Sequence, residues 1–117
     1  MPRAATTTNV FNAVGDASRR DILELLARGE ASVGELVDSL GVPQPQVSRH
    51  LKVLREVDAV RCRTAGRRRL YRVHGPGLAP LQSWIADLTA QANESYDRLD
   101  DHLHELLRTT TDETSNP

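Results

Sequence analysis

The sequence has a single cysteine, few aromatic residues and no long apolar run, and each shortage excludes something. Cys62 alone cannot form an internal disulfide or a cysteine-rich zinc site. The apolar runs fall short of the roughly 18 residues that a membrane span needs, and the first ten residues lack the apolar centre of a signal peptide. We therefore expect a cytoplasmic protein with no membrane partner.

The shortage of aromatic residues, which make up 3% of the 117 residues, leaves the core to Leu, Ile, Val and Ala. A chain of this length fits one domain, and it buries only about two-thirds of the surface that it exposes when unfolded. Further burial in a dimer would therefore stabilise it. We expect one domain over residues 9–107, with disordered polar tails at 1–8 and 108–117.

A net charge of −1 conceals a strong segregation of charge along the chain. Residues 1–42 carry four basic and six acidic side chains, and residues 75–117 carry two basic and eight acidic ones. Residues 43–74 carry nine basic side chains against two acidic ones, a net charge of +7 for this segment alone. Such a segment is the electrostatic footprint expected of a surface that binds phosphate.

The first part of the chain has the periodicity of helices. Residues 10–14 indicate a short helix, and Asp16 or Ser18 can cap the next one. Apolar residues at spacings i, i+3 and i+4 then mark the buried side of a second helix, which ends near Gly29. These apolar residues are Ile22, Leu25 and Leu26.

A helix-turn-helix candidate follows. The Ser32 hydroxyl can accept from the amide of Glu35 while the Glu35 carboxylate reaches back, which forms a capping box. Gly41 suits the left-handed residue that ends this helix, and Pro45 is tolerated as the first residue of the next one. That next helix runs to about Val57. Its inward residues are Val47, Leu51 and Leu54.

Residues 60–74 interrupt the helical pattern. Val60–Thr64 and Leu70–Val73 resemble strands, and Ala65-Gly66 can turn between them, so we predict a β-hairpin over about 61–73. A hairpin directly after the second helix of a helix-turn-helix is the wing of a winged helix. We predict a mainly α fold with a small β-hairpin wing, a winged helix-turn-helix with the order α-α-α-α-β-β-α.

The longest periodic stretch comes last and predicts a helix of about 30 residues, roughly 45 Å long. Pro80 is acceptable only in a first turn, so this helix begins near 77–79 and covers about 78–107. Its apolar stripe consists of Leu78, Leu81, Ile85, Leu88, Ala92, Tyr96, Leu99, Leu103 and Leu106. The stripe is longer than a three-helix core can cover. It therefore packs partly on a second copy of the chain or, alternatively, folds back across its own domain.

The outward face of the helix over 44–57 carries the side chains for reading DNA. An α-helix fits the major groove, where Gln pairs with adenine and Arg with guanine through two hydrogen bonds each. We predict that Gln44, Gln46 and Arg49 read bases, because the N-terminal end of such a helix approaches the base edges most closely. Ser48 and Lys52 are expected to bind phosphate.

The wing supplies further cations. Guanidinium groups at its tip can hold phosphates or enter a minor groove. Arg63 and Arg61 are additional candidates for phosphate, whereas His50, beside the inward stripe, is interpreted as structural. The arginines at the tip are Arg67, Arg68 and Arg69.

These residues together resemble a known family. The segment from Gly41 to Glu56 reads GVPQPQVSRHLKVLRE and resembles the recognition helix of the ArsR/SmtB winged-helix regulators. Residues 16–26 resemble that family's second helix and residues 66–72 its wing, within a likeness over about 9–105. The resemblance implies a homodimer, paired through the first and last helices, that represses transcription from a palindromic operator. The implied interface consists of Val10, Phe11, Leu81, Ile85, Leu88, Ala92, Leu99, Leu103 and Leu106.

The chain departs from that family's pattern in two ways. Asp58 stands where the family usually has glycine, although Asp tolerates the left-handed conformation. The segment 32–40, where many members bind metal through cysteines, has none. We therefore assign no metal and no cofactor.

Two sensing alternatives remain open. Residues 100–105, with His102 and His104, are either a weak zinc cluster or a solvated polar face. Cys62 is either a redox thiol activated by neighbouring arginines or an ordinary half-buried cysteine.

The expected function is a DNA-binding repressor whose partners are a double-stranded DNA operator, a second copy of the chain and an unidentified small-molecule effector. A metal-responsive repressor is one alternative. A winged helix that binds only protein is another, and the +7 segment argues against it. The sequence has no nucleophile–base pair, glycine-rich phosphate loop or convincing metal triad, so we do not expect an enzyme.

Overall fold

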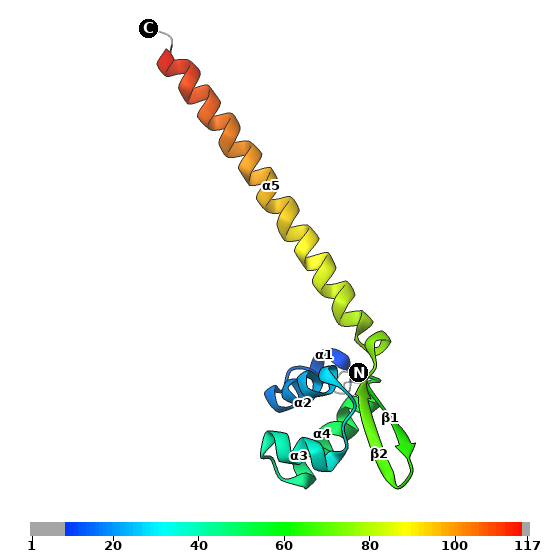
Figure 1. The fold of residues 1–117 in the computed structure, drawn as a ribbon. Coiled ribbons are helices and arrows are strands. Elements are labelled where there is room, and N and C mark those ends of the chain that lie inside the picture. Colours follow the sequence, from blue (N-terminus) through cyan, green and yellow to red (C-terminus); the bar gives the residue numbers. More distant parts are fainter. Residues whose placement is uncertain (1–8, 116–117) are drawn as a thin grey trace, which may run out of the picture. The chain divides into compact units, whose positions relative to one another are not determined.

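The computed structural model describes the backbone of residues 9–115 and the side chains of residues 9–108 (Figure 1). The predicted tail at 1–8 lies outside the described residues. The elements follow the predicted order and are α1 (Val10–Ala13), α2 (Ala17–Arg28), α3 (Val33–Leu40), α4 (Gln44–Glu56), β1 (Val60–Ala65), β2 (Arg68–Val73), the 3-10 turn η2 (Gly75–Leu78) and α5 (Ala79–Ser115). The predicted winged helix-turn-helix is confirmed. By their contacts, residues 1–81 and 82–117 form two units, and each is described by itself.

Side chains and glycine set the ends of α2. Asp16 is the residue that caps its start, because its carboxylate accepts from the amide of Arg19. Arg19 also holds α1 to α2, since its Nε donates to the carbonyl of Ala13 at 2.6 Å. The helix ends at Gly29, as the sequence predicts.

The helix-turn-helix is built as predicted, with a shift of one residue at Pro45. The capping box of Ser32 and Glu35 is present, and Gly41 ends α3 in the left-handed conformation at φ 66°. Pro43 caps α4, so Pro45 is its second helical residue rather than its first. The second position serves as well as the first, because neither amide has a partner within the helix.

The wing is an antiparallel hairpin whose paired residues run from Val60–Val73 to Ala65–Arg68. Its turn is formed by Gly66, in the left-handed conformation, and Arg67, one residue later than the predicted Ala65-Gly66. A third short segment joins the sheet where no strand was predicted. Ala31 and Tyr71 exchange two backbone hydrogen bonds, of 2.8 and 3.1 Å, which fasten β2 to the loop between α2 and α3.

The core of residues 9–81 is aliphatic. β1 contacts α4, and β2 contacts α2 and α3, so the wing is anchored on the same core as the helices (Figure 1). Within the described residues every buried side chain is apolar except that of Tyr71. The largest fully buried side chains are those of Ile22, Leu36, Val47, Leu51, Leu54 and Val60.

The helix α5 begins at Ala79, within the predicted start, and continues to Ser115, beyond the predicted end at 107. The threonine-rich end lowers helix propensity, but neither glycine nor proline occurs between Leu81 and Asn116 to break the helix. Its side chains from Gln82 to Arg108 are all exposed. Among the described residues, no helix combines the length and apolar character that a membrane crossing requires.

Candidate nucleic-acid interface

The helix α4 separates its side chains into a buried and an exposed face. Val47, Leu51 and Leu54 have at most 1% of their surface exposed, as predicted. The five side chains assigned to DNA are all exposed. They are Gln44, Gln46, Ser48, Arg49 and Lys52. The core therefore fixes the orientation of the helix, and this polar set lies away from the core.

His50 lies between these two faces. Its side chain is half-buried and lines a small pocket with Ser18 and Asp21 of α2. Its Nδ1 atom is buried and has no hydrogen-bond partner among the described residues. This position agrees with the structural interpretation of His50.

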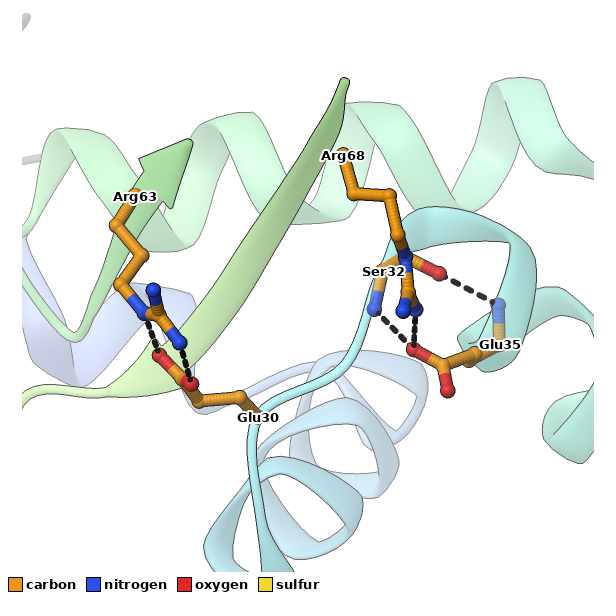
Figure 2. Close-up of polar contacts among 5 residues, drawn as sticks. All are labelled: Glu30, Ser32, Glu35, Arg63 and Arg68. Atoms are coloured by element: carbon orange, nitrogen blue, oxygen red, sulfur yellow. Dashed lines mark hydrogen bonds and ion pairs between the residues drawn. The ribbon is translucent and has the colours of Figure 1, made fainter. Parts of the chain in front are cut away.

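Two carboxylates from outside the basic segment reach the wing, and no pattern in the sequence predicts these contacts (Figure 2). The guanidinium of Arg63 donates from Nε and Nη2 to the two oxygens of Glu30, at 2.8 and 2.7 Å. These bonds hold the pKa of Glu30 below its ordinary value. The pair connects β1 with the loop that follows α2.

The second pair joins the start of β2 to α3. Arg68 Nη2 donates to Glu35 Oε1 at 2.7 Å, and the backbone amide of Ser32 donates to the same oxygen at 2.9 Å. Figure 2 shows both bonds converging on one carboxylate. The hydrogen bond from the Ser32 amide is the main cause that lowers the pKa of Glu35, and Arg68 lowers it further.

Two other arginines of the hairpin also have partners within the wing region. Arg61 forms two hydrogen bonds with Asp58, at 3.0 and 3.2 Å. Arg69 donates to the Cys62 sulfur at 3.3 Å, and its guanidinium carbon lies 6.0 Å from the centre of the Tyr71 ring. Cys62 is half-buried.

Six basic residues of the segment remain without an ion pair among the described residues. They are Arg49, Lys52, Arg55, Arg67, Arg69 and Arg72. Two of them lie on the outer face of α4, and Arg67 forms the wing turn. These side chains can bind phosphate without first breaking an ion pair with a carboxylate.

The residues implied in a dimer interface divide into two groups. Val10 is 6% exposed and packs in the core of its own chain, and Leu81 is partly buried against that core. Ile85, Leu88, Leu99 and Leu103 expose between 48 and 55% of their surface. Ala92 is also exposed, as are Phe11 and Leu106.

The polar end of α5 contains one close pair. His104 Nδ1 lies 3.7 Å from Asp100 Oδ2, one helical turn away, and both side chains are more than 60% exposed. Within the described part of the chain, no three His, Cys, Asp or Glu side chains come together as metal ligands would.

Comparison with known proteins decides the family. Residues 16–61 match the family described as bacterial regulatory protein, arsR family. The HTH-type transcriptional regulator Rv2034 of Mycobacterium tuberculosis is 44% identical over 87 residues, which cover 70% of this chain and 81% of that protein. The chain belongs to the ArsR family. It is therefore a winged helix-turn-helix transcriptional regulator, in a family of regulators rather than of enzymes.

Two further matches support this membership. The transcriptional repressor SdpR of Bacillus subtilis is 29% identical over 77 residues, which cover 66% of this regulator and 86% of that one. A solution structure of Mb0332 from Mycobacterium bovis is described as a homodimeric winged helix-turn-helix DNA-binding domain. It superposes with a TM-score of 0.59 at 27% identity and covers 78% of this regulator and 88% of that domain.

Proposed function

We propose that this ArsR-family regulator is a homodimeric repressor that occupies a palindromic operator. The observation that carries the proposal is the division of α4. Its apolar face packs in the core, and the five side chains assigned to DNA are exposed beside a hairpin rich in arginine. A helix held in this way can enter a major groove without rearranging its own side-chain packing.

On α4, Gln44, Gln46 and Arg49 read base edges, and Ser48 and Lys52 bind phosphate. The first three lie in the first two turns of the helix, the part that approaches bases most closely in this class of motif. No side chain caps the start of α4, in contrast to α2 and α3. The partial positive charge at the start of α4 is therefore not offset by a capping side chain, and it favours an anion there.

On the wing, Arg67, Arg68 and Arg69 contact phosphate or enter a minor groove. Arg67 in the turn is the strongest candidate of the three. Arg68 pairs with Glu35 and Arg69 donates to the Cys62 sulfur, whereas Arg67 has no ion pair among the described residues. We assign a different role to Arg63. Both oxygens of Glu30 hold its guanidinium, so it braces the wing.

The dimer forms through α5. Ile85, Leu88, Leu99 and Leu103 repeat at helical spacing and leave about half of their surface uncovered within one chain. The homodimeric Mb0332 domain supports the same assembly here. We propose 9–107 as the functional domain, with 78–107 as its dimerisation helix.

The sign of regulation is proposed from a relative, because SdpR is named a repressor. The site of action is the cytoplasm, where bacterial DNA lies, and the protein has no enzymatic activity of its own. An unidentified small molecule acts as effector. Metal response through Asp100 and His104 is the second candidate, since these side chains already form a close pair.

Fluorescence anisotropy with the DNA upstream of the protein's own gene tests the proposal. We expect tight binding that weakens steeply with salt, far above the binding of a shuffled duplex of equal length. The titration is repeated with a chelator and with added zinc. Indifference to both supports a metal-independent repressor, and release by zinc supports the second candidate. Equal affinity for both duplexes at every salt concentration would contradict specific recognition of that site.

A further inference from the structure

The two carboxylates that reach the wing hold their arginines differently. Glu30 uses both oxygens on Arg63, in a forked pair that occupies two nitrogens of the guanidinium. Glu35 uses one oxygen, Oε1, and shares it between Arg68 and the amide of Ser32 (Figure 2). Only one nitrogen of Arg68 takes part.

We infer that Glu35 is an internal substitute for a DNA phosphate, which holds Arg68 in the free protein and releases it to the duplex. Glu30, in contrast, keeps Arg63 in both states and positions the wing. The inference rests on the proposed function, because it requires the wing to contact DNA. The Glu35 carboxylate then competes with DNA for Arg68 and sets how strongly the wing binds phosphate.

The ion pair between Arg68 and Glu35 can break at little cost in stability. Both side chains are more than half exposed, at 57 and 56%, and an exposed ion pair contributes little to stability. Duplex DNA offers about one negative charge per 1.7 Å of its axis, a far denser array than one carboxylate. Phosphate can therefore outcompete Glu35 for Arg68.

Breaking this ion pair leaves the fold intact, because Glu35 also belongs to the capping box at the start of α3. Its carboxylate continues to accept from the Ser32 amide, and the Ser32 hydroxyl continues to accept from the amide of Glu35. The start of α3 thus stays capped when Arg68 leaves. The exchange involves one long side chain and no backbone movement.

The ion pair between Arg63 and Glu30 should persist when DNA binds. A forked pair adds geometric specificity and is stronger than a single charged hydrogen bond. Glu30 is also the less exposed of the two carboxylates, at 30%. It directly precedes Ala31, whose backbone bridge to Tyr71 fixes the loop against β2.

A double-mutant cycle tests the exchange, with a duplex of random sequence as the probe, since phosphate contacts do not depend on sequence. Glu35→Gln keeps an oxygen for the Ser32 amide but loses the charge that holds Arg68. We expect it to tighten binding about two- to fivefold at low salt. In the Arg68→Ala background the same change should give no more than the control Asp38→Asn, which removes one exposed charge from the same helix.

Three results would overturn the inference. Equal tightening by Glu35→Gln with and without Arg68 would mean that general repulsion is at work. Weaker binding by Glu35→Gln, with an unchanged thermal melt, would mean that the pair persists on DNA. Absence of salt-dependent binding by the wild type would instead overturn the proposed function, and the inference with it.

Side-chain NMR of the arginine Nε groups separates the two pairs directly. We expect the Arg68 signal to shift on addition of the duplex and the Arg63 signal to stay, with Glu30→Gln used to assign the latter. A shift of the Arg63 signal as large as that of Arg68 would contradict the division of roles between Glu30 and Glu35.

Discussion

The carbonyl oxygen of Asp58 occupies the space that a Cβ atom on Gly77 would need. Asp58 is itself in the left-handed conformation, at φ 62°, and its carboxylate pairs with Arg61 and lies 3.6 Å from His74 Nε2. The His74 amide donates to the carbonyl of Ala59 at 2.8 Å. The segment that precedes β1 and the segment that follows β2 therefore meet at one junction. Gly77 lies at this junction, against the backbone of Asp58.

We predict that Gly77→Ala destabilises the protein by about 1–3 kcal/mol, because the added methyl group overlaps backbone atoms that cannot rotate away. Urea unfolding followed by circular dichroism measures the change. Gly75→Ala is the matched control, since a Cβ atom there meets nothing within 4 Å. Equal stability of the two variants would mean that the junction can rearrange around the added methyl group without lowering the stability of the protein.

Arg49→Ala should lose specificity at one base pair. A guanidinium that makes two hydrogen bonds to guanine contributes about 1–3 kcal/mol to discrimination against the wrong base. The measurement compares affinities for the operator and for a set of operators with single substitutions. Arg55→Ala, an exposed arginine on the same helix to which we assign no base contact, is the control. A loss of equal size on every sequence would reassign Arg49 to phosphate.

Low pH should destabilise the protein at the N-terminal end of α2. The hydrogen bond from the Arg19 amide is the main cause that lowers the pKa of Asp16. A lowered pKa means that the charged carboxylate stabilises the fold above the ordinary aspartate pKa of about 3.9, and that this contribution is lost as the pH falls through the lowered value. Urea unfolding from about pH 6 downward should therefore show a decline in stability below about pH 4.

Asp16→Asn serves as the control, since asparagine caps helices as well as aspartate does but does not titrate. It should be nearly as stable as the wild type at neutral pH and should decline less in acid. If both proteins decline equally, other groups cause the acid sensitivity.

The sequence predicted what depends on neighbours along the chain. The inward face of α4 follows from the spacing of Val47, Leu51 and Leu54, because helical geometry fixes which residues share a face. The capping box of Ser32 and Glu35 is likewise local, three residues apart. The order of the elements and the family follow from such short-range patterns.

Contacts between distant residues could not be predicted in this way. Arg63 with Glu30 and Arg68 with Glu35 are both separated by 33 residues, and nothing in the spacing shows which carboxylate faces the wing. The bridge of Ala31 to Tyr71 is too short to have the alternating pattern of a strand. Charge counting alone therefore overstated how many wing arginines are free.

Replacing Leu99 and Leu103 by Glu should convert the dimer into monomers. Both side chains lie on the apolar stripe of α5 and are about half exposed in one chain, at 55 and 48%. In a dimer they would be covered, and burying four unpaired carboxylates is far more costly than burying leucine. Sedimentation should give the mass of one chain, 13.0 kDa, instead of about twice that value.

Ala90→Glu is the control for this change, because the 100° step per residue puts Ala90 on the side of α5 opposite Leu99. We expect it to remain dimeric. The leucine variant should also lose specific DNA affinity, since a monomer presents one recognition helix where the dimer presents two to half-sites about 10 base pairs apart or a multiple of that. A leucine variant that stays dimeric would assign the interface to other residues, whereas a monomer with full specific affinity would show that one α4 suffices.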